Sequence, residues 1–150
     1  MKIVVLKFGG TSVGSIYRIK QIAKIIRQHI KTKKKVIVVS SAMSGVTNKL
    51  INKTKQISDN FSPSEYDVLV SSGEQMSCAL IAGRLNHLGI KSRSWLSWQV
   101  PIFTKGDFKK SRITNILKKR ILKNLETGGV PIITGFQGVN HENSLLPQKM

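Results

Sequence analysis

Residues 2–12 read KIVVLKFGGTS, an apolar run followed by a lysine, two glycines and two hydroxyl side chains. The aliphatic residues at positions 3–6 are typical of a strand that is buried on both faces, as in the centre of a parallel sheet. Gly9 and Gly10 then allow the backbone to turn sharply with its N–H groups uncovered. Aliphatic residues recur at three- and four-residue spacing over residues 16–30, which predicts a helix with Ser15 as its N-cap. The stretch therefore predicts a strand, a glycine turn and a helix.

A turn of this kind can bind phosphate, because backbone N–H groups and a helix N-terminus both favour negative charge. Lys7 stands at the end of the strand, where its ammonium group can reach the same phosphate. The turn matches neither GxGxxG nor GxxxxGK[ST], the two common nucleotide-binding patterns. From these residues alone, a tight turn with an incidental surface lysine is an equally good interpretation.

A second apolar strand is predicted at residues 36–39, and the small and hydroxyl residues SSAMSGVTN follow it at positions 40–48. Strand, helix and strand in this order form a parallel βαβ unit. Ligands of open parallel sheets bind beyond the carboxyl ends of the strands. We therefore expect Ser41 and Thr47 to lie at a ligand site. The alternative is that these hydroxyls only cap the helix expected from about residue 46 to residue 55.

A longer helical pattern covers residues 64–88, with a break expected near residues 71–73. It begins at Ser62-Pro63 with the spacing of a capping box, and Gly89 ends it. Glu74 follows the expected break and is one of seven acidic residues in the chain. Its carboxylate could hold an ammonium group near the phosphate. It could also simply favour the helix dipole.

The rest of the chain continues the α/β pattern. Strands are expected at residues 90–98 and 100–104, an amphipathic helix at 113–125, and a buried strand at 130–134. A third glycine-containing strand end, Gly135-Phe136-Gln137-Gly138, follows the last strand, and residues 139–150 show neither period.

The chain carries 25 Lys and Arg against 7 Asp and Glu, a formal charge of +18. Such a charge raises the expectation of a polyanionic partner. The lysines are scattered, however, and no RNA-binding pattern with interleaved aromatic residues is present. We therefore interpret the lysines as solubilising residues and expect no specific nucleic acid partner.

Cysteine and histidine usage argues against a disulfide or a protein-bound metal. Cys78 is the only cysteine and falls in an apolar helical run, where a small core residue is expected. The three histidines show no metal-ligand spacing. No signal peptide is recognisable, and no stretch reaches the ~20 apolar residues of a membrane span. The simplest expectation is a cytoplasmic protein with no membrane partner.

Four segments together resemble the aspartokinases of the amino acid kinase family. They occur in the family's order over about residues 2–140, and they are KFGGTSV (7–13), VVSSAMSGVTN (38–48), SGEQMS (72–77) and GFQG (135–138). The first is shared across the wider fold, whereas the second and third are typical of aspartokinases. The resemblance implies a three-layer αβα architecture with a mainly parallel central sheet, the carbamate kinase-like fold of this family.

The resemblance also implies an activity. Aspartokinases transfer the γ-phosphoryl group of ATP, with Mg²⁺ as part of the co-substrate, to the β-carboxylate of L-aspartate. The product, 4-phospho-L-aspartate, opens the routes to diaminopimelate and lysine, threonine and methionine. By this resemblance Lys7 is catalytic, and Lys7 with the backbone of Phe8, Gly9 and Gly10 holds the transferring phosphoryl group of ATP.

For the aspartate end, the resemblance implies that Ser41 and Thr47 contact L-aspartate. Glu74 would bind its ammonium group, and Phe136 would line the substrate pocket. These roles agree with the chemistry, since phosphoryl transfer depends mainly on positioning and on positive charge at the developing oxyanion.

The sequence departs from the family after Asn140. Family members continue with a segment like TTLGRGGSDTSA, whereas residues 141–150 read HENSLLPQKM. We therefore expect residues 1–140 to be the N-terminal, substrate-binding half of the catalytic domain and residues 141–150 to be an atypical tail. The nucleotide-binding half and the regulatory ACT domains, on which much of the family's oligomerisation depends, would be absent. Little or no kinase activity is expected from this chain alone.

Two alternatives stay open from the sequence. One is another enzyme of the same fold that acts on a different small acid or on a nucleotide, against which Glu74 in its SSGEQMS setting argues. The other is a basic nucleic-acid-binding protein, for which binding should be tight and fall steeply with salt.

Overall fold

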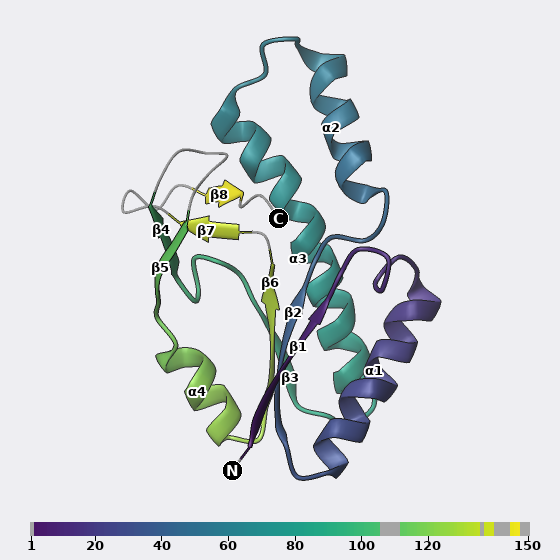
Figure 1. The fold of residues 1–150 in the computed structure, drawn as a ribbon. Helices are drawn as coiled ribbons and strands as arrows, with labels where there is room; N and C mark the ends of the chain where they lie inside the picture. The colour runs from purple at the N-terminus through teal and green to yellow at the C-terminus, as the bar shows by residue number, and fades with distance from the viewer. Residues whose placement is uncertain (1, 106–111, 136, 140–144, 148–150) are drawn as a thin grey trace.

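The computed structural model describes residues 2–105, 112–135, 137–139 and 145–147. Within these ranges the chain forms two small sheets and four helices (Figure 1). The helices are α1 (Ile16–Lys31), α2 (Val46–Ile57), α3 (Pro63–His87) and α4 (Lys119–Glu126). The α/β class predicted from the sequence is confirmed.

The first sheet is entirely parallel, so the carboxyl ends of its strands meet at one edge. Its order is β1-β2-β6-β3. The strands are β1 (Ile3–Phe8), β2 (Lys35–Ser40), β6 (Val130–Thr134) and β3 (Ser92–Trp95). Strands β2 and β6, both predicted from short apolar runs, lie in the middle, and all five residues of β6 are buried. The predicted strand at residues 90–98 is present but shorter.

Strand β1 does not lie where its sequence predicts. Among the described residues it has a strand neighbour on one side only, β2. Leu6 and Phe8 pack towards the core on one face, while Ile3 and Val5 on the other face are 47% and 60% exposed. The prediction of a central strand buried on both faces is therefore wrong for this chain, because nothing in its described part covers the second face.

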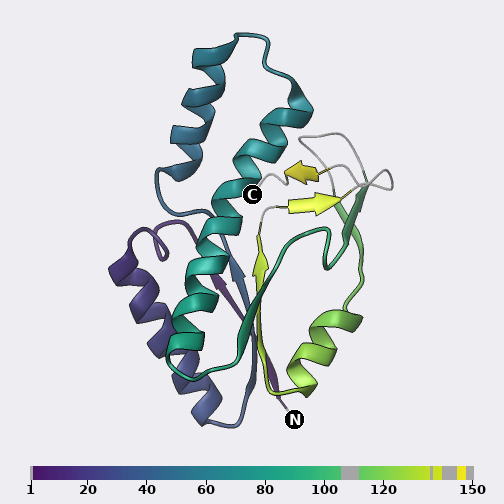
Figure 2. The ribbon, with the colours of Figure 1, turned by 180° about the vertical axis from the view of Figure 1, so that it is seen from behind.

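Helices cover both faces of the sheet, as expected for three layers. Helices α1 and α3 pack side by side on one face, and α4 lies on the other (Figures 1 and 2). The larger core cluster lies beneath α1 and α3 and includes Ile22, Ile26, Val38, Ile81 and Ile132. The smaller cluster lies beneath α4 and comprises Trp95, Val100, Ile121, Leu125 and Ile133.

The predicted start of α1 is confirmed, because the Ser15 hydroxyl accepts a hydrogen bond of 3.2 Å from the Arg18 N–H. Helix α3 begins with Pro63 as predicted, but the Ser62 side chain makes no capping bond. Gly89 adopts φ +74° just beyond the end of α3, as the prediction requires.

The predicted break in α3 near residues 71–73 is wrong, since the helix is continuous. A Cβ atom on Gly73 would lie 3.0 Å from the Ala42 Cβ and 3.3 Å from Val46 Cγ1. The glycine therefore allows close approach between α3 and the loop after β2. Hydroxyl–carbonyl bonds from Ser71 to Val68 and from Ser72 to Leu69 keep these serines compatible with the helix.

The second sheet was not predicted. Its order is β5-β4-β7-β8, from β5 (Arg112–Ile116), β4 (Ile102–Lys105), β7 (Gln137–Val139) and β8 (Leu145–Pro147). The prediction of a helix at residues 113–125 is confirmed only for its second part, α4. Its first part is wrong, because residues 112–116 form a strand that pairs antiparallel with β4. The β-branched residues in RITNI favour that pairing. Strand β8 lies in the stretch where no periodicity was found.

No helix in the described part of the chain has the length and apolar character needed to cross a membrane.

One buried acid in α3 predicts a pH dependence of stability. Asp67 is 6% exposed, its Oδ2 has no hydrogen-bond partner among the described residues, and burial raises its pKa from 3.8 to about 6. The folded state therefore binds this proton more tightly than the unfolded state. The resulting stabilisation is complete below pH 4 and is lost as the pH rises through 6.

We expect Asp67→Asn to remove this pH dependence and to raise the free energy of unfolding at pH 7.5 by roughly 1–2 kcal/mol, after allowance for solvent screening. Urea unfolding at pH 4, 5, 6 and 7.5 measures the effect. Asp59→Asn, an exposed position outside the helices, is the control and should change neither the stability nor its pH profile. A parallel pH profile for the Asp67 variant and the parent would contradict the expectation.

Candidate functional site

A cavity of about 230 Å³ opens at the carboxyl ends of β1 and β2, where the glycine turn, the loop after β2 and helix α3 meet. Its lining residues are Gly10, Ser41, Ala42, Met43, Ser44, Gly45, Thr47 and Glu74. Four of the residues predicted from the sequence, Gly10, Ser41, Thr47 and Glu74, therefore come together although they lie in three separate segments. The alternative that these hydroxyls only cap the following helix is wrong, because α2 has Gly45 as its N-cap and no side-chain capping bond, whereas Ser41, Ser44 and Thr47 line the cavity.

Backbone hydrogen bonds fix the two loops that form this cavity to each other. The Ser41 N–H donates to the Phe8 carbonyl at 3.0 Å, and the Ser44 N–H donates to the Gly10 carbonyl at 3.1 Å. A Cβ atom on Gly10 would lie 3.0 Å from the Ala42 carbonyl oxygen. Glycine is thus needed at this position for close approach of the loops, which the sequence interpretation did not foresee.

Glu74 is the one charged residue among those that line the cavity. It is 3% exposed, and its Oε1 accepts a hydrogen bond of 3.3 Å from the Ala42 N–H. Burial, and after it the negative charge of Glu74, raises the pKa of the Cys78 thiol to about 12. Cys78 is fully buried and stays a thiol at neutral pH, which agrees with its expected role as a core residue.

The chemical character of the cavity follows from these groups. It offers one desolvated carboxylate, two hydroxyl side chains from the predicted set and glycine-rich backbone. A buried carboxylate is stabilised by a positively charged partner. The arrangement therefore suits a small ligand with a cationic group and further polar atoms. In the described part of the chain, no group of three or more His, Cys, Asp and Glu side chains could hold a metal ion.

Ser77 and Ser40 support the cavity from behind and were missed in the sequence. The Ser77 Oγ lies 2.7 Å from the Ser41 carbonyl and 2.9 Å from the Glu74 carbonyl, and it accepts a bond of 3.2 Å from the Ser40 hydroxyl. Both serines are fully buried. The available signal was the spacing of Glu74 and Ser77, three residues apart and hence on one helix face.

Ser77→Ala should lower the free energy of unfolding by about 1–2 kcal/mol, because it removes the buried hydroxyl that bonds to the Ser41 carbonyl and accepts from the Ser40 hydroxyl. Ser72→Ala is a matched control on the same helix, since the Ser72 hydroxyl is exposed and bonds only to the preceding turn at Leu69. Urea unfolding of both variants measures the difference. Equal stability of the two variants would show that the Ser77 bonds contribute nothing.

Of the residues predicted to bind phosphate, Gly10 lines this cavity, whereas Lys7, Phe8 and Gly9 lie at the same edge of the sheet but outside its lining. Lys7 is exposed and, by strand alternation, lies on the same face of β1 as Ile3 and Val5. The Gly9 carbonyl accepts the Ser12 and Val13 N–H groups at 2.9 and 3.2 Å, which closes the turn.

The Phe8 side chain lines a different cavity beside α1. The structure thus places Lys7, Phe8 and Gly9 next to Gly10 without bringing them into the cavity of Glu74. Phe136 lies outside the described residues.

Comparison with known proteins gives consistent results. An aspartokinase of Rickettsia felis is 45% identical over 148 residues, which cover 97% of this chain and 37% of the relative. The structure of aspartate kinase from Synechocystis matches with a TM-score of 0.77 and 31% identity over 98% of this chain and 24% of that chain. The structure of E. coli aspartokinase III in complex with aspartate and ADP matches with a TM-score of 0.81 and 21% identity, over 98% of this chain and 43% of that chain.

The chain therefore spans little more than a third of the length of the curated relative, 37%. The structure of Giardia carbamate kinase also matches, with a TM-score of 0.70 and 12% identity over 97% of this chain and 63% of that chain. Together with the likeness to E. coli aspartokinase III, this match confirms the carbamate kinase-like fold expected from the sequence. The family model for amino acid kinases covers residues 2–148, almost all of the sequence. This chain belongs to the amino acid kinase family.

Proposed function

We propose that this chain is the substrate-binding part of a cytoplasmic aspartate kinase, which transfers the γ-phosphoryl group of ATP to the β-carboxylate of L-aspartate. One observation carries the proposal: Ser41, Thr47 and Glu74 line a single cavity together with Gly10 of the glycine turn. The curated relative with 45% identity is an aspartokinase, which supports the same substrate. In this proposal residues 1–140 form the substrate-binding half of the domain.

At the aspartate end, the buried Glu74 carboxylate binds the substrate's ammonium group. An ion pair that is formed away from water is strong only when both partners are satisfied, and the Ala42 N–H already supports one Glu74 oxygen. Ser41 and Thr47 contribute hydroxyl groups that orient the substrate. A dicarboxylic acid without an ammonium group cannot form this ion pair and is therefore expected to bind more weakly.

At the phosphate end, Lys7 and the backbone N–H groups of the glycine turn bind the transferring phosphoryl group. Mg²⁺ enters as part of the nucleotide substrate. Phosphoryl transfer requires little covalent participation by the protein, so holding the two reactants in line and compensating charge are the main contributions. The bonds between the Phe8–Gly10 turn and the Ser41–Ser44 loop fix the two ends relative to each other.

Isothermal titration of the 150-residue chain with L-aspartate and with succinate tests the proposal. Succinate has both carboxylates but no ammonium group, so L-aspartate should bind at least tenfold more tightly. Carbamate, L-glutamate and a nucleoside monophosphate are the competitors that represent other substrates of the fold. Tighter binding of any of these competitors than of L-aspartate would contradict aspartate as the substrate. Equal binding of succinate and L-aspartate by folded protein would contradict it as well.

A further inference from the structure

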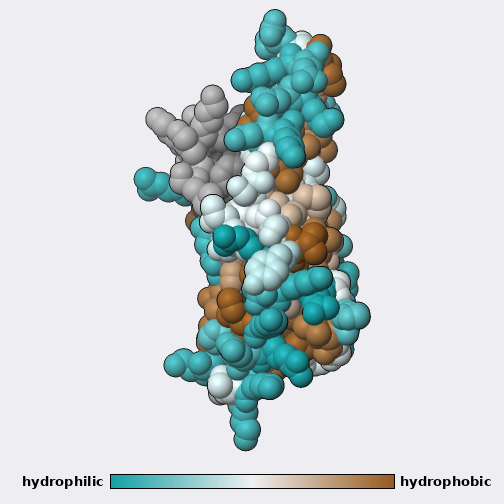
Figure 3. All heavy atoms as spheres, turned by 90° about the vertical axis from the view of Figure 1, so that its right-hand side faces the viewer, coloured by the Kyte–Doolittle hydropathy of each residue, from teal (hydrophilic) through white to brown (hydrophobic). Residues whose placement is uncertain are grey.

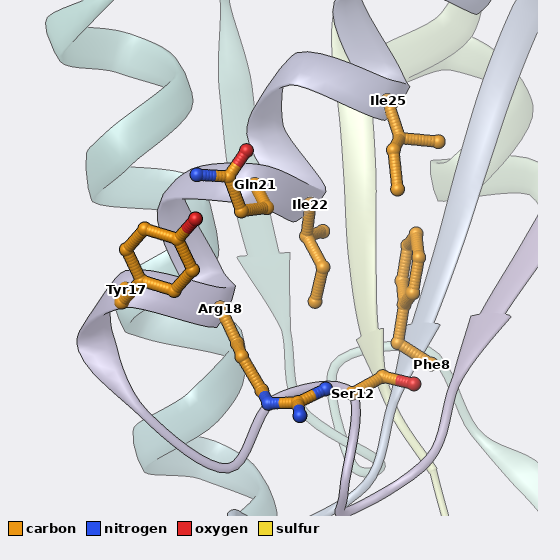
Figure 4. A pocket seen from close by; sticks show the side chains of 7 residues that line it. All are labelled: Phe8, Ser12, Tyr17, Arg18, Gln21, Ile22 and Ile25. Carbon is orange, nitrogen blue, oxygen red and sulfur yellow. The ribbon is translucent and has the colours of Figure 1, made fainter.

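Arg18 of α1 lies beside the glycine turn and was missed in the sequence. Its backbone N–H donates to the Ser15 hydroxyl, so it belongs to the first turn of the helix. From there its side chain points towards Ser12 of the glycine turn, and both residues line the cavity of about 430 Å³ beside α1 (Figure 4). Among the described residues, the Arg18 guanidinium makes no hydrogen bond or ion pair. Its N–H donors therefore face an open cavity next to the turn.

Lys7 and Arg18 approach the glycine turn from opposite faces of β1. The Phe8 side chain packs on the face that α1 covers, and it lines the same cavity as Arg18. Successive residues of a strand point to opposite faces, so Lys7 points away from α1. The turn at residues 9–14 follows directly after this strand. An anion bound on the turn therefore lies between an ammonium group and a guanidinium group.

The surroundings of Arg18 are positively charged. Figure 3 shows the side of the molecule where α1 lies, and hydrophilic side chains cover much of it. All charged residues of this helix are basic, and they are Arg18, Lys20, Lys24, Arg27 and Lys31. The first acidic residue of the chain is Asp59, which follows α2. No carboxylate of the segment from β1 to α2 therefore compensates the charge of Arg18, and the positive potential attracts anions to this end of α1.

We propose that Arg18 is a further phosphate-binding residue, which together with Lys7 holds the phosphate chain of the ATP substrate at the glycine turn. This role depends on the proposed function, since ATP is the phosphoryl donor in that reaction. A phosphate chain carries several negative charges, more than the single charge of Lys7 compensates. The planar guanidinium group can bind two phosphate oxygens at once, whereas an ammonium group acts as a point charge. Arg18 thereby orients the phosphate chain, and Lys7 compensates the charge of the transferring group.

Arg18 is not placed to bind the acid substrate. It does not line the cavity of Ser41, Thr47 and Glu74, and the cavity that it does line contains none of these three residues. Substitution of Arg18 should therefore leave the binding of L-aspartate unchanged. The role of Arg18 and the identity of the acid substrate can thus be tested separately on the same protein.

Titration calorimetry of the 150-residue chain with inorganic tripolyphosphate tests this role, because the probe has the phosphate chain of ATP without its base and ribose. Arg18→Gln removes the guanidinium charge and should weaken the binding of tripolyphosphate by about tenfold. Arg18→Lys keeps the charge but loses the planar group, so its affinity should lie between those of the parent and Arg18→Gln. Inorganic phosphate, which is too short to contact both cations, should bind the parent roughly tenfold more weakly than tripolyphosphate.

Arg27→Gln is the matched control, because Arg27 is an exposed arginine of the same helix and lies about 2.5 turns beyond Arg18. It removes the same charge from the chain and should change the binding of tripolyphosphate less than about twofold.

An equal loss of affinity in Arg18→Gln and Arg27→Gln would assign the binding to the general charge of the chain and would overturn the proposal. Unchanged affinity in Arg18→Gln, or no binding of tripolyphosphate by the folded parent, would overturn it as well. L-Aspartate is titrated into the same proteins. No binding of L-aspartate by the parent would contradict the proposed substrate, and the tripolyphosphate titrations would still decide whether Arg18 binds phosphate.

Discussion

Glu74→Gln should lower the affinity for L-aspartate by about 100-fold and should leave the affinity for succinate unchanged or slightly higher. Glutamine keeps a carbonyl oxygen at the position that accepts the Ala42 N–H, so the loop after β2 stays in place. Only the negative charge is lost. Removing one partner of a desolvated ion pair costs about 2–5 kcal/mol, and 100-fold in affinity lies within that range.

The control for this prediction is Glu65→Gln, which removes the same charge from an exposed position in the first turn of α3. It should change L-aspartate binding less than twofold, since charges on the surface are screened. Titration calorimetry on the three proteins gives both affinities. If Glu74→Gln weakened L-aspartate and succinate equally, Glu74 would be a structural support and not the ligand of the ammonium group.

Two glycines of α3 should respond in opposite directions to the same substitution. Gly73→Leu is expected to reduce the free energy of unfolding by about 2–3 kcal/mol, because Ala42, Val46 and Leu50 already lie within 3.6 Å of the position of a new Cβ atom. Gly83→Leu is expected to raise it by about 0.5–1 kcal/mol, because nothing lies within 4 Å of its Cβ position and leucine is the better helix former.

Urea unfolding monitored by circular dichroism measures both effects under the same conditions. Gly73→Ala, with a smaller side chain, provides an intermediate case if the leucine variant does not fold. L-Aspartate binding should also be weaker in the Gly73 variants, since the substitution separates Glu74 from the loop after β2. Equal stability of Gly73→Leu and Gly83→Leu would show that α3 and the loop can move apart at no cost.

Local patterns were enough to predict the elements whose formation depends on their own residues. Helix α1 with its Ser15 cap, strand β6 and the end of α3 at Gly89 all match the sequence prediction. The break expected at Gly73 did not occur, because packing against Ala42 and not backbone flexibility explains that glycine. Residues 112–116 form a strand because they pair with β4, which precedes them in the chain, and such a pairing is not visible in their own pattern.

The candidate site was predictable for the residues that follow strand ends, which are Gly10 after β1 and Ser41 and Thr47 after β2. They line one cavity as expected, since parallel strands place their carboxyl ends at one edge, and Glu74 reaches the same cavity from within α3. Ser77 was missed because its role lies in a contact with the carbonyl of Ser41, and backbone acceptors leave no trace in a sequence. The exposure of β1 could not be predicted either. An apolar run indicates that a strand is suited to burial, but it does not show whether other elements of the chain cover that strand.

The two backbone bonds between the glycine turn and the loop after β2 have a consequence for motion during a reaction cycle. Backbone hydrogen bonds already join Phe8 to Ser41 and Gly10 to Ser44, so a ligand does not have to order these two loops when it binds. We therefore expect the two loops to move together and to stay in place when a ligand binds. Slow amide hydrogen exchange at Ser41 and Ser44, with and without L-aspartate, is the expected observation.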